Sequence, residues 1–118
     1  SPYTLTAQNA HMGIPVPFDI STLKMTATVR NDESADNLRV AVFKATAPNG
    51  SKTAMTLTLV EEVAVTVAFQ DRHYNANFKK VLSSNITAGE LLFVALYRDG
   101  STTSKNKVQF SYTLSAET

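Results

Sequence analysis

The polar segment 71–77 offers the groups best suited to holding a ligand. It combines an aromatic ring, a guanidinium group, a carboxylate and several amides, in the residues Asp71, Arg72, His73, Tyr74, Asn75 and Asn77. Proteins use such groups in loops to bind sugars or a protein partner, although an ordinary connection between strands can have the same composition. The chain has no tryptophan to stack on a sugar ring, so its tyrosines would have to do so. We take Asp71 to Asn75 as the candidate ligand loop.

The remaining metal-ligating side chains are not spaced as a metal site requires. His11 and His73 lie in separate irregular segments with no third ligand at a recognisable spacing, and zinc needs three or four converging ligands. Asp32, Glu33 and Asp36 share one turn but lack the Asp-x-Asp-x-Asp-Gly pattern of a calcium loop. The sequence therefore predicts no metal site.

No catalytic constellation is evident in the sequence. Glu61 and Glu62 are adjacent, and neighbours in an extended strand point to opposite faces, so they would cooperate as acid and base only if the strand were bulged. Gly-x-Ser-x-Gly is absent, the four glycines are isolated from one another, and there is no cysteine for thiol chemistry. We predict a protein that is not an enzyme, with no catalytic residue and no cofactor.

Length and charge restrict the partners further. With 118 residues, 43% of them hydrophobic, the chain is expected to form a single domain over residues 1–118 with its own core. A net charge of +1 and a basic patch limited to Arg72, Lys79 and Lys80 argue against nucleic acid. No run of about 18 to 20 apolar residues is present, so no membrane partner is expected. The N-terminus does not resemble a signal peptide, which indicates a chain that is either not exported or already processed.

Alternation of apolar and polar residues predicts strands throughout, and no segment has a helical period. The expected strands are 23–30, 38–44, 55–59, 63–69, 78–82, 91–97 and 108–114. Glu61-Glu62 is interpreted as a tight connection between two strands, although one long bent strand fits almost as well. Residues 1–18, which contain Pro15 and Pro17, are expected to be an extended arm or an edge strand. The fold class predicted is an all-β, antiparallel two-sheet sandwich of seven to eight strands, with jelly-roll or Greek-key connections and an immunoglobulin-like order as the alternative.

Segment 91–97 is apolar at every position, which raises the question of what covers its two faces. A two-layer sandwich covers only one face with its own core. We therefore expect either a subunit interface or a cover formed by loops or by the N-terminal arm. The candidate interface comprises Leu92, Val94, Leu96, Pro15 and Pro17, and the expected assembly is a homo-oligomer, a dimer or a trimer.

The C-terminal third combines the Thr87-Ala88-Gly89 loop, the apolar strand 91–97 and the aromatic alternating strand 108–114. In these features it resembles the closing strands of small jelly-roll domains in bacteriophage virion proteins. Capsid decoration proteins and fibre heads belong to this group, so the resemblance implies a non-enzymatic structural or attachment protein located in the virion. Its partners would be copies of itself or a capsid or tail protein lattice. The alternative is an extracellular carbohydrate-binding module or lectin that binds a glycan through the candidate ligand loop.

Overall fold

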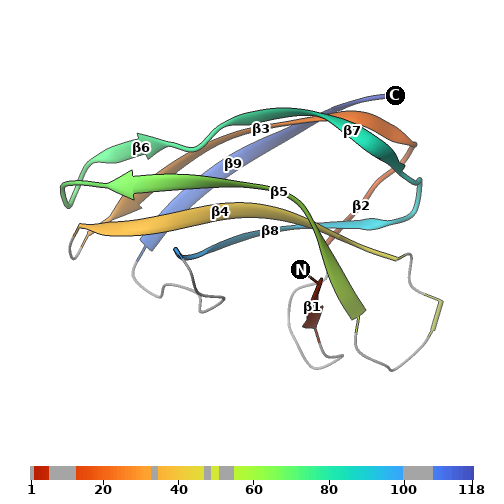
Figure 1. The fold of residues 1–118 in the computed structure, drawn as a ribbon, viewed down its shortest axis with the longest axis horizontal. Coiled ribbons are helices and arrows are strands. Elements are labelled where there is room, and N and C mark those ends of the chain that lie inside the picture. Colours follow the sequence, from red (N-terminus) through yellow and green to blue (C-terminus); the bar gives the residue numbers. More distant parts are fainter. Residues whose placement is uncertain (1, 6–12, 33–34, 47–48, 51–54, 100–107) are drawn as a thin grey trace.

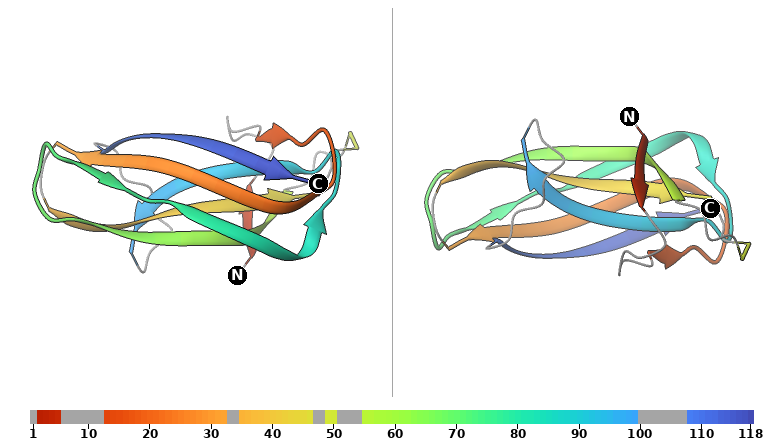
Figure 2. Two further views of the ribbon diagram at one scale, coloured as in Figure 1. Left: turned by 90° about the horizontal axis from the view of Figure 1, so that it is seen from above. Right: turned by 90° about the horizontal axis from the view of Figure 1, so that it is seen from below.

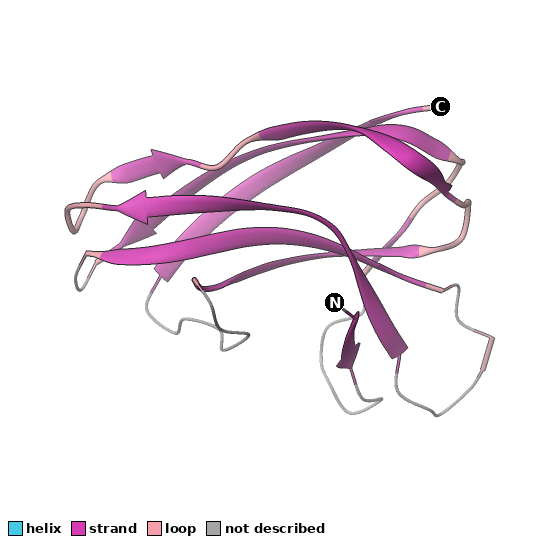
Figure 3. Ribbon diagram, in the orientation of Figure 1, coloured by secondary structure: helices cyan, strands magenta, loops and turns pink. Residues whose placement is uncertain are grey.

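A computed structural model describes residues 2–5, 13–32, 35–46, 49–50, 55–99 and 108–118 (Figure 1). All regular structure in these residues is β-strand, as Figure 3 shows. The strands are β1 (Pro2–Leu5), β2 (Ile14–Pro15), β3 (Ile20–Asn31), β4 (Asp36–Ala45), β5 (Met55–Val67), β6 (His73–Asn75), β7 (Phe78–Ile86), β8 (Leu91–Arg98) and β9 (Val108–Glu117). The described part of the chain has no helix that could span a membrane.

The strands form two antiparallel sheets packed face to face (Figure 2). Sheet A has the order β1-β5-β4-β8-β2. In sheet B, β3 is central, with β9 along one side and β6 followed by β7 along the other. From β2 onward the chain crosses between the sheets at every connection except the β4–β5 and β6–β7 connections. The prediction of an antiparallel two-sheet sandwich is therefore confirmed.

The core lies between the two sheets, and strand alternation determines which side chains enter it. On β3, the side chains of Leu23, Met25, Ala27 and Val29 are buried, while Lys24 and its outward neighbours are exposed or half-buried. Sheet A contributes alternate residues of β4, β5 and β8 to the same cluster. β2 lies at the edge of sheet A, paired with β8 through Ile14 and Pro15, which is where a proline-bearing strand is tolerated.

β5 is one long strand with a β-bulge, rather than two strands joined at the glutamates. Val42 pairs with Glu61 and Phe43 pairs with Leu59, so Val60 is the extra residue on β5. Before the bulge, Leu57 and Leu59 face away from sheet B; after it, Val65 and its alternate neighbours face the core. The two alternating runs in the sequence are therefore two faces of one strand. The tight connection that we preferred at Glu61-Glu62 is not formed, because the bulge bends the strand without ending it.

Deleting Val60 should be tolerated, whereas deleting a residue elsewhere in the strand should not. Without Val60, the residues on either side of it become neighbours in a regular ladder, so Leu57 still faces outward and Val65 still faces the core. The free energy of unfolding should then fall by about 1–3 kcal/mol, the contribution of one partly buried side chain. Deletion of Ala64 keeps the bulge but turns the following core residues of β5 outward, because a slip of one residue turns every side chain over, and should cost at least about 3 kcal/mol. Urea unfolding followed by circular dichroism measures both variants, and equal losses would contradict this role of the bulge.

Candidate functional site

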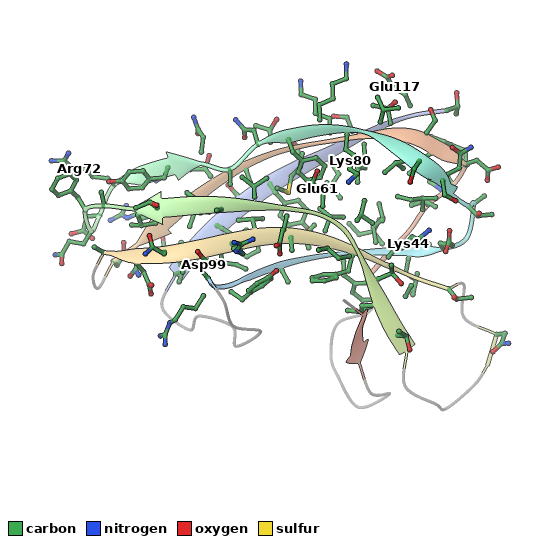
Figure 4. The ribbon with its side chains drawn as sticks, viewed as in Figure 1. Lys44, Glu61, Arg72, Lys80, Asp99 and Glu117 are labelled. Carbon is green, nitrogen blue, oxygen red and sulfur yellow. The ribbon has the colours of Figure 1, made fainter. Side chains whose placement is uncertain are left out.

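The candidate ligand loop lies at one end of the sandwich, where the chain passes from β5 in sheet A to β6 in sheet B (Figure 4). Asp71 has a φ of 61°, a left-handed conformation that aspartate tolerates better than most residues. Its backbone N–H donates to the carbonyl oxygen of Asn31, with an N···O distance of 3.0 Å. The turn is thereby fixed to the end of β3.

The structure brings together two of the predicted loop residues and one that the sequence analysis did not single out. The guanidinium carbon of Arg72 lies 4.6 Å from the centroid of the Phe69 ring, a cation–π contact at the tip. The backbone N–H of Phe69 donates to the hydroxyl oxygen of Tyr74 over 3.0 Å. His73 and Asn75 are exposed residues of β6 and lie opposite residues of β3. The sequence contains one indication that Phe69 belongs to this site, because Phe69 ends an alternating apolar run directly before the polar segment.

The carboxylates near this tip are held by an arginine. Arg30 Nε lies 2.6 Å from Asp32, and Arg30 also lies 3.5 Å from Asp71. The amide nitrogen of Gln109 donates to the second oxygen of Asp32 at 3.2 Å, which joins β9 to the cluster. The hydrogen bond and the charge of Asp32, followed by the charge of Asp71, raise the pKa of Arg30. This arrangement is an ion-pair cluster that ties the loop to sheet B.

The residues considered for metal binding do not converge in the described part of the chain. No group of three or more histidine, aspartate or glutamate side chains there could hold a metal ion. Asp32 is hydrogen-bonded to Arg30, and Asp36 accepts a hydrogen bond from the backbone of Asn37. His11 and Glu33 lie outside the described residues.

A second polar cluster lies on the outer face of sheet A. Arg39 donates from Nη1 to Glu62 and from Nε to Asp99, both over 2.5 Å. The Tyr97 hydroxyl donates to the other carboxylate oxygen of Glu62, also over 2.5 Å. The hydrogen bond and charge of Asp99, and then the charge of Glu62, raise the pKa of Arg39. The cluster joins β4, β5 and β8 across three neighbouring strands.

The two adjacent glutamates point to opposite faces of β5. Glu62 belongs to the outer cluster, whereas Glu61 lies 3.6 Å from Lys80 Nζ on β7 and so bridges the two sheets (Figure 4). The bulge at Val60 does not bring the two carboxylates onto one face. Each carboxylate instead has its own cation, an arrangement suited to holding strands together and unsuited to exchanging a proton between the pair.

Next to the Arg39 cluster, the outer face of sheet A carries a second apolar cluster, which we call the outer layer. It comprises Ala41, Phe43, Ala45, Leu57, Leu91, Phe93 and Tyr97, with Leu59 and Ala95 packed against them. The chain passes close to this layer just before β2, because a Cβ atom on Gly13 would lie 2.7 Å from Cζ of Phe93. The protein's own chain therefore covers this layer at Phe93.

The predicted interface residues of β8 lie on the other face of the strand. Leu92 and Leu96 are only 4% and 7% exposed in the core between the sheets, and Val94 packs against the same cluster. This differs from the predicted subunit contact, because sheet B of the same chain already fills the space in front of them. Pro15 and Pro17 are exposed near the edge of sheet A, so they alone of the five predicted residues remain at the surface.

Comparison of the chain with protein-family models, curated proteins and solved structures finds no match. The resemblance of the C-terminal third to phage jelly-roll domains stays a prediction. Function is therefore inferred from the strand order and from the surfaces described above.

Gly13 should be sensitive to any side chain because two penalties coincide there. Its φ is +73°, which strains other residues, and the added Cβ would overlap the Phe93 ring. Gly50 is a matched control, since its φ is +87° and nothing lies within 4 Å of an added Cβ. Gly50→Ala should lower the free energy of unfolding by about 1 kcal/mol through strain alone, and Gly13→Ala by about 2–4 kcal/mol. Urea unfolding measures both values. Equal losses would show that Gly13 does not pack on Phe93.

Proposed function

We propose that this chain is a non-enzymatic structural or attachment domain of a bacteriophage particle, such as a capsid decoration protein or a fibre head. The observation that supports it is the strand order. An eight-stranded jelly roll, numbered along the chain, has sheets of order 1-8-3-6 and 2-7-4-5, and this architecture occurs in viral capsid domains. Here β2-β8-β4-β5 matches the second sheet, and β9-β3 followed by β6 and β7 matches the first sheet without its strand 1.

The polar clusters of the described residues fit this role, because their charges are used within the fold. Arg30 and Arg39 each hold two carboxylates, and Glu61 pairs with Lys80 between the sheets. Surface pairs of this kind orient strands and loops but contribute little stability individually. Such a domain would act through extended surfaces in contact with its own copies or with a capsid or tail protein lattice.

The second candidate function is glycan binding at the tip, and one observation favours it. The Phe69 ring is 59% exposed, and it lies beside the cationic Arg72 at the end of the sandwich. An exposed ring with a polar neighbour can stack on a sugar, but the guanidinium already occupies part of the ring surface. The particle role is therefore the proposal, and a lectin is its alternative.

The particle role predicts that the chain is a component of purified phage particles. Mass spectrometry of particles purified from the source of this chain should detect it at a fixed ratio to the major capsid protein, and the ratio should survive a second purification. Immunogold labelling would then place it on the shell or on a fibre. Absence of the chain from particles whose other structural proteins are detected would exclude this function.

The lectin alternative predicts binding on a glycan array that depends on the tip. Phe69→Ala and Arg72→Ala would then each reduce binding at least tenfold, because each removes one side of the stacked pair. Lys24→Ala, an exposed position on β3, serves as the control that leaves the tip intact. No binding by the parent protein, or equal binding by all variants, would remove this alternative.

A further inference from the structure

Three of the four sheet edges carry features that limit pairing with another chain. β2 spans two residues, of which Pro15 cannot donate to a ladder, and it covers only the first two residues of β8. The rest of β8 has no described strand on that side, but its large apolar side chains Phe93, Leu96 and Tyr97 are buried within the chain. β5 is paired with β1 over its first residues, and beyond them it has the bulge and the charged Glu61 and Glu62. β7 presents charged residues, among them the exposed Lys79. Short length, proline, bulges and lysine are the usual protections of an edge strand.

The fourth edge, β9, has none of these protections. Residues 108–116 form nine consecutive positions without a charge, a proline or a glycine. Among the described residues, β9 pairs with β3 alone, over its whole length from Val108 to Glu117. Its other side therefore presents a long row of backbone N–H and C=O groups, which forms a template for one more strand.

The inward side chains of β9 are also incompletely covered. On the neighbouring β3 the inward residues are fully buried, but Phe110 and Leu114 on β9 are only half-buried. Tyr112, stacked on Phe110 with ring centroids 5.9 Å apart, is 38% exposed. In a complete jelly roll, strand 1 would lie along this edge and cover these side chains. No strand of the described residues occupies that place beside β9.

We propose that β9 of a second copy of this chain occupies that place, in a two-fold antiparallel pair that continues sheet B from one subunit into the other. The sequence of β9 is suited to pairing with itself. In the register that overlaps all of residues 108–116, Tyr112 faces its equivalent, Phe110 faces Leu114, and Ser111 faces Thr113. Apolar residues then share the inner face and neutral polar residues the outer face, with no like charges opposed.

The β9 pairing would be the contact between copies that the proposed function requires. Only the biological role of the dimer rests on the proposed function. The pairing itself is a property of the isolated protein. Edge pairing buries less surface than a standard interface of about 1,600 Å², so we expect a weak dimer that requires measurement at about 100 µM. At that concentration, light scattering should give close to twice the 12.8 kDa of one chain.

Opposed charges on β9 test the pairing directly. Ser111 and Thr113 are exposed on the outer face, and each faces the other across the proposed two-fold axis. The double variant Ser111→Lys/Thr113→Lys, and likewise Ser111→Glu/Thr113→Glu, should raise the dimer dissociation constant at least tenfold. An equimolar mixture of the two variants should recover the dimer. Thr26→Lys, on the same face of the central β3, is the control that should remain dimeric.

The outcomes separate this contact from other assemblies. Three results would each overturn β9 pairing: a monomeric parent, a lysine variant that stays dimeric, or a mixture of variants that fails to recover the dimer. The last result would also be expected if a different strand of the neighbouring copy paired with β9. Circular dichroism and urea unfolding of each variant establish that monomeric variants are folded. A monomeric parent found in phage particles would overturn the pairing alone, whereas a dimeric parent absent from particles would overturn the proposed function alone.

Discussion

The structure depends on one constraint, namely that sheet A must bury apolar side chains on both of its faces. Its inner face packs on sheet B, and its outer face carries a second cluster that includes Phe43 and Phe93. The bulge at Val60 makes this arrangement compatible with a single strand β5, because it moves the apolar positions from one face to the other halfway along. Glu61 and Glu62 follow directly after the bulge. Glu61 pairs with Lys80 of sheet B, and Glu62 pairs with Arg39 in the outer polar cluster.

The fold class could be predicted from local patterns, since alternation in β3 and β9 indicates a strand with one face toward the core. Where a strand lacks this alternation, the sequence does not indicate which of its side chains face the core. β8 is apolar at every position, so periodicity does not distinguish Leu92 and Leu96 from Phe93, and only the packing of sheet B decides between them. The bulge in β5 could not be predicted either, because one inserted residue leaves a regular alternation of apolar and polar residues on each side of it.

The tip of the sandwich shows the same limit for the candidate site. Its polar residues could be found in the sequence as a cluster, but their partners lie elsewhere. Arg72 contacts Phe69 from the preceding strand, and Asp71 contacts Arg30 on β3. A segment that reads as a set of free ligand groups therefore has several of its side chains engaged in holding the β5–β6 turn. Only long-range contacts, which no local pattern contains, distinguish these two situations.

The covered outer layer also determines where association between copies can occur. If the outer face of sheet A were open, Phe93 and its neighbours would be the natural contact, and a second copy would stack face on face. Gly13 approaches the Phe93 ring too closely to leave room for a partner at that point. Along β9, by contrast, the exposed Tyr112 and the half-buried Phe110 and Leu114 lie beside a backbone that no described strand other than β3 pairs with. Association along an edge adds hydrogen bonds to an existing sheet while leaving the outer faces, with their charged side chains, in water. A domain that paired with its own copies in this way would still have both outer faces and the Phe69 tip available for further contacts.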